Sequence, residues 1–322
     1  MTTAADTAAD ESIHVTVLEL RWEAAGVVSV RLGPEDGALP GWEPGAHVDV
    51  VLPNRIVRQY SLVESAPDLR WYRVAVQLDP ESRGGSEYIH RFLRPGQQVR
   101  VRGPRNHFPM PKHGPLVLVG GGIGITPLLA MLRSAQAHSR PWSLHYGGRS
   151  RGTMAFLPEL EPYRDRVRLW PSDETGLPPL DEIVSSAGHD STILACGPGA
   201  MLDAVGAAVA RSGIPEERLQ VERFKARPRP PTVDAPVLVR AARSEREVLV
   251  DENTSLLDGL LRAGVRVSSS CRNGVCGTCE VAVLAGVPDH RDDVLTQAQQ
   301  AAGASMLVCV SRAVGGEVTL DV

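Results

Sequence analysis

Four of the five cysteines in this 322-residue chain are spaced as ligands of a metal cluster. Cys271, Cys276 and Cys279 follow the pattern C-x4-C-x2-C, and Cys309 comes later in the chain. Each iron of a binuclear cluster needs two thiolates, and a tight loop that supplies three of the four is typical of one class of [2Fe–2S] site. The pattern therefore predicts a [2Fe–2S] cluster with these four cysteines as its metal ligands.

Two glycines inside this loop support the prediction. Gly274 and Gly277 can adopt positive φ, which lets backbone N–H groups approach the cluster sulfurs. Free cysteines, a disulfide pair and a zinc site are the alternatives, but zinc sites usually show paired C-x2-C units and disulfides need an oxidising compartment. On these residues the end of the chain resembles a plant-type ferredoxin. Only Cys196 is left over, so the cysteine usage predicts a reducing, cytoplasmic location.

Two short segments near the start of the chain are chemically unusual. Arg58-Gln59-Tyr60-Ser61 lies in an expected strand, so Arg58 and Tyr60 share a face. Arg83-Gly84-Gly85-Ser86 precedes an expected helix over 87–93, and a glycine-rich turn at the start of a helix suits a phosphate. Taken singly, the first segment is usually ordinary packing and the second an ordinary turn.

The middle of the chain carries two loops that could bind a dinucleotide. Gly121, Gly122, Gly124 and Thr126 lie between an expected buried strand over 116–119 and an expected helix over 128–137. Small residues there let backbone N–H groups reach a pyrophosphate at the start of the helix, although the G-x-G-x-x-G fingerprint is absent. Cys196-Gly197-Pro198 follows a later strand, and Cys196 alone would more often be a buried small hydrophobe.

Three kinds of element are needed to position these groups. Residues 13–113 contain about six short alternating strands with turn signals between them, which predicts an antiparallel β-barrel. Residues 114–226 alternate strands and helices, which predicts an α/β domain with a parallel sheet. Four prolines mark 227–236 as a semi-rigid linker, and 237–322 predict an α+β domain with a leucine-rich helix over 254–263.

Taken in this order, the chain resembles the ferredoxin reductase superfamily. R-G-G-S, Arg105-Asn106-His107-Phe108-Pro109 and Glu222-Arg223-Phe224, followed by the cysteine pattern, are similar to the phthalate dioxygenase reductase and vanillate demethylase reductase family. The resemblance implies a flavin barrel, a nicotinamide domain and a β-grasp ferredoxin. It also implies FMN, a pyridine nucleotide and a plant-type cluster that feeds a separate oxygenase.

The resemblance assigns roles to individual residues. Tyr60 would lie against the flavin, and Ser61 would hydrogen-bond its reactive edge. Cys196 would lie beside nicotinamide and flavin without acting as a nucleophile, and Phe224 would stack on the flavin unless it is an ordinary core phenylalanine. An arginine in the phosphate turn favours FMN, whose terminal phosphate profits from a fork of donors. The remaining flavin ligands would be Arg58, Gln59, Arg83, Gly84, Gly85, Ser86 and the backbone of Ala75, Val76 and Gln77.

The sequence leaves the choice between NADH and NADPH open. Arg149 and Arg151 follow the second strand of the α/β domain, where ribose selectivity is set in such domains. Two arginines could hold a 2′-phosphate, and no acidic residue follows closely. The family, however, is often NADH-dependent, so the expected donor is NAD(P)H.

Composition excludes several other classes of protein. The net charge is −4 with 22% charged residues, which gives no basic bias toward nucleic acid. The longest apolar stretch, 116–132, is broken by four glycines and a proline, so no membrane span is expected, and residues 1–12 resemble a disordered tail instead of a signal peptide. A monomer is expected.

The sequence thus predicts a reductase that passes electrons from NAD(P)H through FMN and a [2Fe–2S] cluster to a terminal oxygenase, either Rieske-type or haem-thiolate. Nicotinamide moves electrons in pairs and the cluster moves them singly, so a flavin is needed between them. Two alternatives stay open: a redox sensor with little turnover, and a stand-alone flavin reductase.

Overall fold

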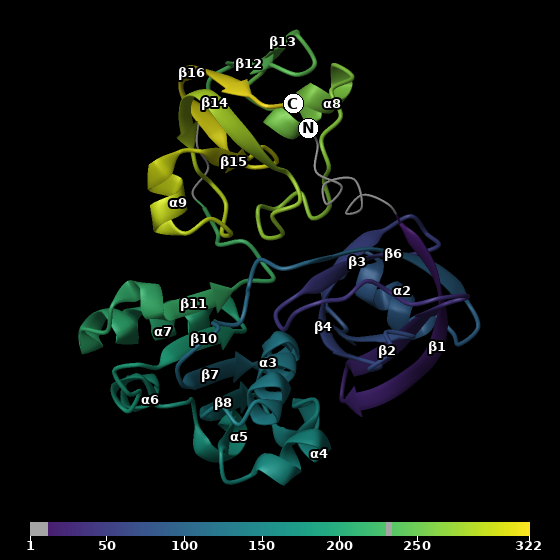
Figure 1. The fold of residues 1–322 in the computed structure, drawn as a ribbon, viewed down its shortest axis with the longest axis vertical. Coiled ribbons are helices and arrows are strands. Elements are labelled where there is room, and N and C mark those ends of the chain that lie inside the picture. The colour runs from purple at the N-terminus through teal and green to yellow at the C-terminus, as the bar shows by residue number, and fades with distance from the viewer. Residues whose placement is uncertain (1–11, 230–233) are drawn as a thin grey trace. The chain divides into compact units, whose positions relative to one another are not determined.

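The computed structural model describes residues 12–229 and 234–322, which form two compact units, Met1–Glu222 and Arg223–Val322 (Figure 1). Apart from residue 12, the predicted N-terminal tail lies outside the described residues, as do 230–233 of the predicted linker. In the described part of the chain, no helix has the length and apolarity that crossing a membrane would require.

The first unit begins with the predicted antiparallel barrel. It closes in the order β1-β2-β5-β4-β3-β6. Val48, Val50 and Leu62 are among the residues that fill its interior, as the period of two in these strands requires. The strands are β1 (Ile13–Ala24), β2 (Val27–Pro34), β3 (His47–Val51), β4 (Val57–Ser65), β5 (Tyr72–Gln77) and β6 (Gln98–Arg105), and the helix α2 (Gly85–Arg91) lies between β5 and β6 in sequence.

The barrel has a seam between β4 and β5. β5 pairs with β2 along its whole length, from Tyr72 to Gln77. Its pairing with β4 runs only from Tyr72 to Val74, because residues 57–61 of β4 pair with β3 alone. The backbone of residues 75–77 therefore pairs with β2 only, and its side toward β4 has no strand partner.

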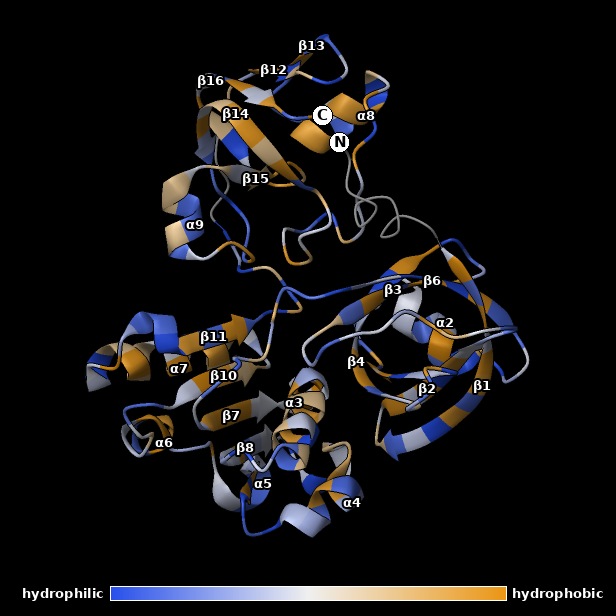
Figure 2. Cartoon of the chain, viewed as in Figure 1, coloured by the Kyte–Doolittle hydropathy of each residue, from blue (hydrophilic) through white to orange (hydrophobic). Residues whose placement is uncertain are grey.

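The second part of this unit is the predicted parallel sheet, in the order β11-β10-β7-β8-β9. Helix α3 lies between this sheet and the barrel in Figure 1, and α6 and α7 pack against the sheet through Val117, Ile193 and Val205. Figure 2 shows the hydrophobic colour along the central strands, as expected for strands covered on both faces. The elements are β7 (Leu116–Gly121), η1 (Gly122–Gly124), α3 (Ile125–Ala137), β8 (Trp142–Gly148), η2 (Arg151–Thr153), α4 (Leu157–Leu160), η3 (Glu161–Tyr163), β9 (Val167–Pro171), α5 (Ser172–Thr175), α6 (Leu180–Ser185), β10 (Thr192–Cys196), α7 (Gly199–Ser212), η4 (Glu216–Arg218) and β11 (Leu219–Glu222).

Barrel and sheet are joined by buried charges as well as by a shared core. Arg73 on β5 is 3% exposed and donates to Glu23 on β1 at 2.6 Å and to Glu159 on α4 at 2.8 Å. Arg133 on α3 also pairs with Glu159 and donates to the carbonyl oxygen of Val63 at 3.1 Å. This group of charges fixes the sheet domain against the outer surface of the barrel.

The second unit contains a mixed sheet in the order β13-β12-β16-β14-β15, with β12 parallel to β16. Leu256, Leu257 and Leu260 pack helix α8 into the core, and Ser255 caps that helix by accepting from the Asp258 backbone N–H at 3.0 Å. This is the predicted α+β domain. Its elements are β12 (Val237–Ala241), β13 (Arg246–Val250), α8 (Leu256–Arg262), β14 (Glu280–Asp289), α9 (Gln297–Ala302), β15 (Ser305–Leu307) and β16 (Arg312–Leu320).

The described part of the predicted linker is bound to this second unit. The backbone N–H of Arg227 donates to Asp293 at 2.9 Å, and Arg229 donates to the carbonyl oxygen of Asp292 at 3.1 Å. On the far side of residues 230–233, Asp234 accepts two hydrogen bonds from Arg291 at 2.7 and 3.0 Å. The linker segment is thus held at both of its ends.

Candidate cofactor and coenzyme sites

The structure brings the two predicted phosphate-binding segments together. Arg58 donates to the carbonyl oxygen of Arg83 at 2.8 Å. A Cβ added to Gly85 would come within 2.5 Å of the Arg58 side chain, so only glycine lets the turn approach the arginine this closely. Burial and the nearby Arg83 lower the pKa of Arg58. An anion would relieve the repulsion between the Arg58 and Arg83 charges, and a phosphate group fits that requirement.

Ser86 lies in the same turn but is already engaged. Its hydroxyl accepts from the backbone N–H of Asp79 at 3.1 Å and donates to Ser82 at 3.0 Å. Gly84 has a φ of +83°, which favours glycine there, and precedes the first residue of α2. Ser86 therefore closes the turn, and the backbone and arginines are the groups open to a ligand.

Buried polar atoms without partners lie along β4. Ser61 is 5% exposed, and neither its hydroxyl nor the Nε2 of Gln59 has a hydrogen-bond partner among the described residues. The same holds for Nε2 of His47, which is paired with Ser61 across β3 and β4. Burial raises the pKa of Tyr60, so its phenol stays neutral. Orphaned donors and acceptors in a native interior indicate a missing partner, and a heteroaromatic ring with polar edges fits them.

Ala75, Val76 and Gln77 lie at the seam described above. Ala75 and Val76 are 4% and 1% exposed, and the carbonyl oxygen of Val76 lies 3.0 Å from Nε2 of His90 on α2. Because β4 does not pair with these residues, their backbone groups on that side are available to a planar ligand. The three residues thus lie on one side of the unpaired stretch between β5 and β4, and the residues of β4 with orphaned atoms lie on the other side.

The two predicted dinucleotide loops meet at the carboxyl end of the parallel sheet. A Cβ on Gly124 would lie 2.2 Å from the carbonyl oxygen of Cys196, and one on Gly121 would lie 2.7 Å from Pro198. The strand order reverses between β7 and β10, from which these loops emerge. Ligands of open α/β sheets bind in the crevice at such a switch point. Thr126 is 2% exposed and donates to the carbonyl oxygen of Ile123 at 2.9 Å, so it closes the loop.

Cys196 is fully buried and has an acidic neighbour that sequence reasoning missed. Its thiol lies 3.9 Å from a carboxylate oxygen of Glu222, its register partner on β11. Burial, followed by the carboxylate, raises the pKa of Cys196 well above its usual value. Part of Glu222 reaches the surface, yet burial of its carboxyl group raises its pKa to about 8. Both groups are largely uncharged near neutral pH, consistent with a thiol that is not a nucleophile.

The predicted ribose-selectivity residues lie at the next strand along. Arg149 is exposed directly after β8, and Arg151 pairs with Glu174 on α5 at 3.0 Å. This carboxylate is not predictable from local sequence, because 22 residues separate it from Arg151. Neighbouring parallel strands place the loops after β8 and β9 at the same edge of the sheet. A correct prediction of the strand order would therefore have brought Glu174 close to Arg151.

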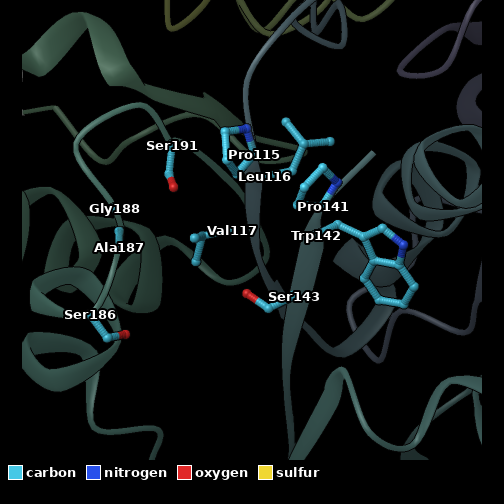
Figure 3. A pocket seen from close by; sticks show the side chains of 10 residues that line it. All are labelled: Pro115, Leu116, Val117, Pro141, Trp142, Ser143, Ser186, Ala187, Gly188 and Ser191. Carbon is cyan, nitrogen blue, oxygen red and sulfur yellow. The ribbon is translucent and has the colours of Figure 1, made fainter. Parts of the chain in front are cut away.

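The hollow in Figure 3 is at the wrong end of the sheet for a coenzyme. This cavity of about 260 Å³ is lined by Leu116, Trp142 and Ser191, which lie at or just before the first residues of β7, β8 and β10. The glycine loop and Cys196 lie at the opposite, carboxyl ends of the same strands. The candidate coenzyme crevice therefore lies at the two loops and not at this cavity.

In the second unit, the thiols of the four predicted cluster ligands are neighbours. Cys271 lies near Cys276, and Cys279 lies near Cys309. Three of the four are between 2% and 8% exposed, and Cys271 is less buried. No three metal-binding side chains converge on one point within the described residues. Four neighbouring thiols suit a binuclear cluster, in which each iron takes two thiolates.

The loop that carries these cysteines has the expected glycine geometry. Gly274 and Gly277 have φ of +70° and +69°. A Cβ on Gly274 would lie 2.7 Å from Val310, so this position also needs a small residue. Cys309 lies in the turn that follows β15.

Phe224 is a predicted flavin residue that falls in the second compact unit, whereas the other predicted flavin residues fall in the first. It lies beyond the end of β11, is 41% exposed and belongs to the second compact unit. Its predicted stacking on the flavin stays a prediction.

Comparisons with known proteins agree with the fold and the two kinds of site. Residues 239–314 match the 2Fe-2S iron-sulfur cluster binding domain. The chain is 41% identical to the phenoxybenzoate dioxygenase subunit beta of Ectopseudomonas oleovorans over 321 residues, which covers 99% of each chain.

Two solved structures are also similar over nearly the whole chain. An intact type IV self-sufficient cytochrome P450 monooxygenase has a TM-score of 0.89 at 37% identity, covering 97% of this chain and 41% of that one. Phthalate dioxygenase reductase has a TM-score of 0.70 at 34% identity, covering 97% and 98%. With this fold, this cluster domain and relatives this similar over their full length, the chain belongs to the phthalate dioxygenase reductase and vanillate demethylase reductase family of oxidoreductases.

Proposed function

We propose that the protein is the reductase component of an oxygenase system and carries electrons from NAD(P)H through FMN and a [2Fe–2S] cluster to a separate terminal oxygenase. One observation carries the proposal: a single chain combines a nucleotide crevice at a sheet switch point with a 2Fe-2S domain that holds four neighbouring thiols. The phthalate dioxygenase reductase similar to this chain is described as a modular structure for electron transfer from pyridine nucleotides to [2Fe-2S].

The flavin, when bound, would supply the exchange between paired and single electrons. Arg58, Arg83 and the Gly84-Gly85 turn would hold its phosphate. Ser61 and Gln59 would satisfy their orphaned polar atoms on the ring, Tyr60 would pack against it, and the seam residues 75–77 would offer backbone groups. Two arginines at one turn favour FMN, because a terminal phosphate dianion profits from several charged donors.

The coenzyme would lie across the crevice between the glycine loop and Cys196-Gly197-Pro198. Backbone N–H groups of Gly121, Gly122 and Gly124 would face its pyrophosphate. Cys196 would stay a neutral thiol that packs beside the nicotinamide. The four cysteines of the second unit would ligate the cluster, with Cys271 and Cys276 on one iron and Cys279 and Cys309 on the other.

The partner would be a terminal oxygenase, either a Rieske-type enzyme or a haem-thiolate monooxygenase. Phenoxybenzoate dioxygenase subunit beta belongs to a dioxygenase system, whereas the P450 monooxygenase has a similar reductase segment within its own chain. We expect the reductase to be monomeric and cytoplasmic.

The purified protein tests the proposal directly. Released flavin should chromatograph as FMN, and iron and labile sulfide should each approach about two per chain. The protein should reduce both ferricyanide and cytochrome c with NADH or NADPH, and Cys276→Ser should abolish only the cytochrome c activity. FAD would contradict the phosphate argument. One zinc without sulfide, or an unchanged cytochrome c rate in the variant, would contradict the cluster's place in the electron path.

A further inference from the structure

We propose that Asp293 is a positioning residue that binds the chain leaving the sheet domain to the cysteine loop, and that it thereby speeds electron transfer from flavin to cluster. The inference rests on the proposed function, because it concerns the same electron path. NADH would supply the electrons as a pair, the bound flavin would release them one at a time, and the cluster would be reduced and pass each to the acceptor. Four residues make these contacts, and we call them the linker clamp: Arg227, Arg229, Asp292 and Asp293.

The linker side of the clamp is built on the carboxylate of Asp293. This side chain is 4% exposed, and one of its oxygens accepts from the backbone N–H of Arg227 at 2.9 Å. The other oxygen lies 3.5 Å from Nε of Arg227 and 3.7 Å from a guanidinium nitrogen of Arg229. Arg229 also donates to the carbonyl oxygen of Asp292 at 3.1 Å. A buried carboxylate with one backbone donor and two cations is a stronger anchor than an exposed ion pair.

The cluster side of the clamp is the loop that carries three of the predicted ligands. The backbone N–H of Asp293 donates at 2.9 Å to the carbonyl oxygen of Gly274, which lies within the C-x4-C segment. A Cβ on Gly274 would come within 3.2 Å of the Cα of Asp292. The Asp292 carboxylate in turn accepts from the N–H groups of Val294 and Leu295 at 3.0 and 2.7 Å, which fixes this segment. Asp293 therefore binds the linker through its side chain and the cysteine loop through its backbone.

The next described contact of the linker is made by Asp234. Its carboxylate accepts from the Arg291 guanidinium at 2.7 and 3.0 Å. The backbone N–H of Arg291 donates to Ser311 at 3.1 Å, and Ser311 follows the fourth predicted ligand, Cys309, by two residues. Asp234 would therefore still anchor the chain to this unit if the linker clamp were opened.

The spacing of these contacts along the chain sets the size of the expected effect. Strand β11 ends at Glu222, so four residues, 223–226, precede Arg227. Without the linker clamp the first anchor would be Asp234, which eleven residues, 223–233, precede. The effective concentration of a tethered module falls roughly as the −3/2 power of tether length, which predicts a loss of about fivefold. Transfer to the cluster should slow accordingly, while the flavin and coenzyme residues of the first unit stay unchanged.

The test uses the full-length holoprotein with NADH as donor. Asp293→Ala should lower cytochrome c reduction and the single-turnover rate of cluster reduction by about three- to tenfold, and should leave ferricyanide reduction unchanged. Arg227→Gln/Arg229→Gln makes the same test from the linker side, where the two side chains are 58% and 37% exposed. It should show the same split with a smaller loss, because the Arg227 N–H keeps its acceptor. If Asp293→Ala does not fold, this double variant decides.

Hydrogen exchange gives a readout that needs no turnover. The Arg227 amide should be protected in the wild type and exchange faster in Asp293→Ala, as measured by mass spectrometry on a peptide that covers 224–229. Asp293→Asn keeps a carbonyl oxygen and should restore part of this protection. Iron content and the electron paramagnetic resonance spectrum of the reduced cluster should stay as in the wild type, which separates loss of positioning from damage to the cluster.

Arg240→Gln/Arg243→Gln is the matched control. It removes the same two charges from exposed ion pairs of the same unit, with Glu247 at 2.9 Å and Asp321 at 2.7 Å, and should change neither the rates nor the exchange. An unchanged ratio of cluster to ferricyanide rates in the Arg227/Arg229 double variant overturns the inference. So does an equal loss of both rates, or an Arg227 amide that exchanges as fast in the wild type as in Asp293→Ala. A wild type without flavin, or one that does not reduce cytochrome c, contradicts the proposed function instead.

Discussion

Among single residues, Glu222 has a protonation state that should affect stability. Its carboxyl pKa is raised to about 8, mainly by burial, whereas an unfolded chain has a value near 4.3. Between these two values the folded protein binds more protons than the unfolded one. The free energy of unfolding should therefore fall as pH rises from about 4.3 to about 8, and this contribution should then level off.

Glu222→Gln should remove this dependence. The amide keeps an oxygen for the Cys196 thiol and carries no charge, so the variant should unfold at a higher temperature than the wild type, with a larger difference at about pH 8.5 than at about pH 5.5. Thermal unfolding followed by circular dichroism at both pH values measures this. Glu217→Gln, at an exposed glutamate nearby, is the control. An equal difference at both pH values would mean that the Glu222 carboxyl group titrates normally.

Gly124 should tolerate no side chain. Its Cβ would lie 2.2 Å from a backbone oxygen, so Gly124→Ala must displace the Cys196 loop and should cost about 1–3 kcal/mol together with most of the coenzyme affinity. Gly206 lies within α7 with open space around it, and Gly206→Ala should instead stabilise the protein by about 0.5–1 kcal/mol. Urea unfolding and NADH titration check both. If Gly124→Ala and Gly206→Ala have similar effects on stability and NADH binding, Gly124 is not in close contact with the carbonyl oxygen of Cys196.

At the scale of elements, the buried charges between β5 and α4 hold two substructures together. Arg73→Met would leave Glu23 and Glu159 without this partner in the interior, and breaking such a pair typically costs about 3–5 kcal/mol. The variant should show a lower unfolding midpoint. It should also show a slower hydride transfer in single-turnover measurements, because the sheet domain loses its fixed position against the barrel.

The matched control is Arg164→Gln in the same sheet domain. Arg164 and Glu161 are 77% and 74% exposed and 3.9 Å apart, so their loss should change neither stability nor rate measurably. If Arg73→Met unfolds at the same denaturant concentration as this control, the buried group does not join the two substructures.

Strong local patterns made most elements predictable. The alternation of apolar and polar residues predicts the six barrel strands. The glycine loop predicts the start of α3, and the leucine spacing predicts α8. The sequence patterns do not predict α5 of the sheet domain or the strands β12, β13 and β16 of the second unit. α5 has only four residues, and two consecutive glycines interrupt the alternation of β16. The Cys196–Glu222 and Arg151–Glu174 contacts join residues far apart in sequence. They follow from strand order, which local sequence does not encode.

For the whole molecule, the division at Glu222 and Arg223 suggests where the chain can be cut. A protein ending at Ala226 would keep the barrel, the sheet domain and Phe224, and would lose Arg227 with the unit to which it binds. It should bind flavin and reduce ferricyanide with NADH, and it should serve cytochrome c poorly. Cytochrome c reduction at the full-length rate would show that electrons leave from the flavin and not from the cluster.

The seam between β4 and β5 has a consequence for the life of the protein in a cell. Without flavin, residues 75–77 lack a pairing partner on the β4 side, and the buried polar atoms of Gln59 and Ser61 have no hydrogen-bond partner among the described residues, which costs stability. A ligand that binds only the folded state adds stability in proportion to the logarithm of its concentration. We therefore expect newly made chains to be degraded faster when riboflavin is scarce, so that vitamin supply sets the abundance of this protein.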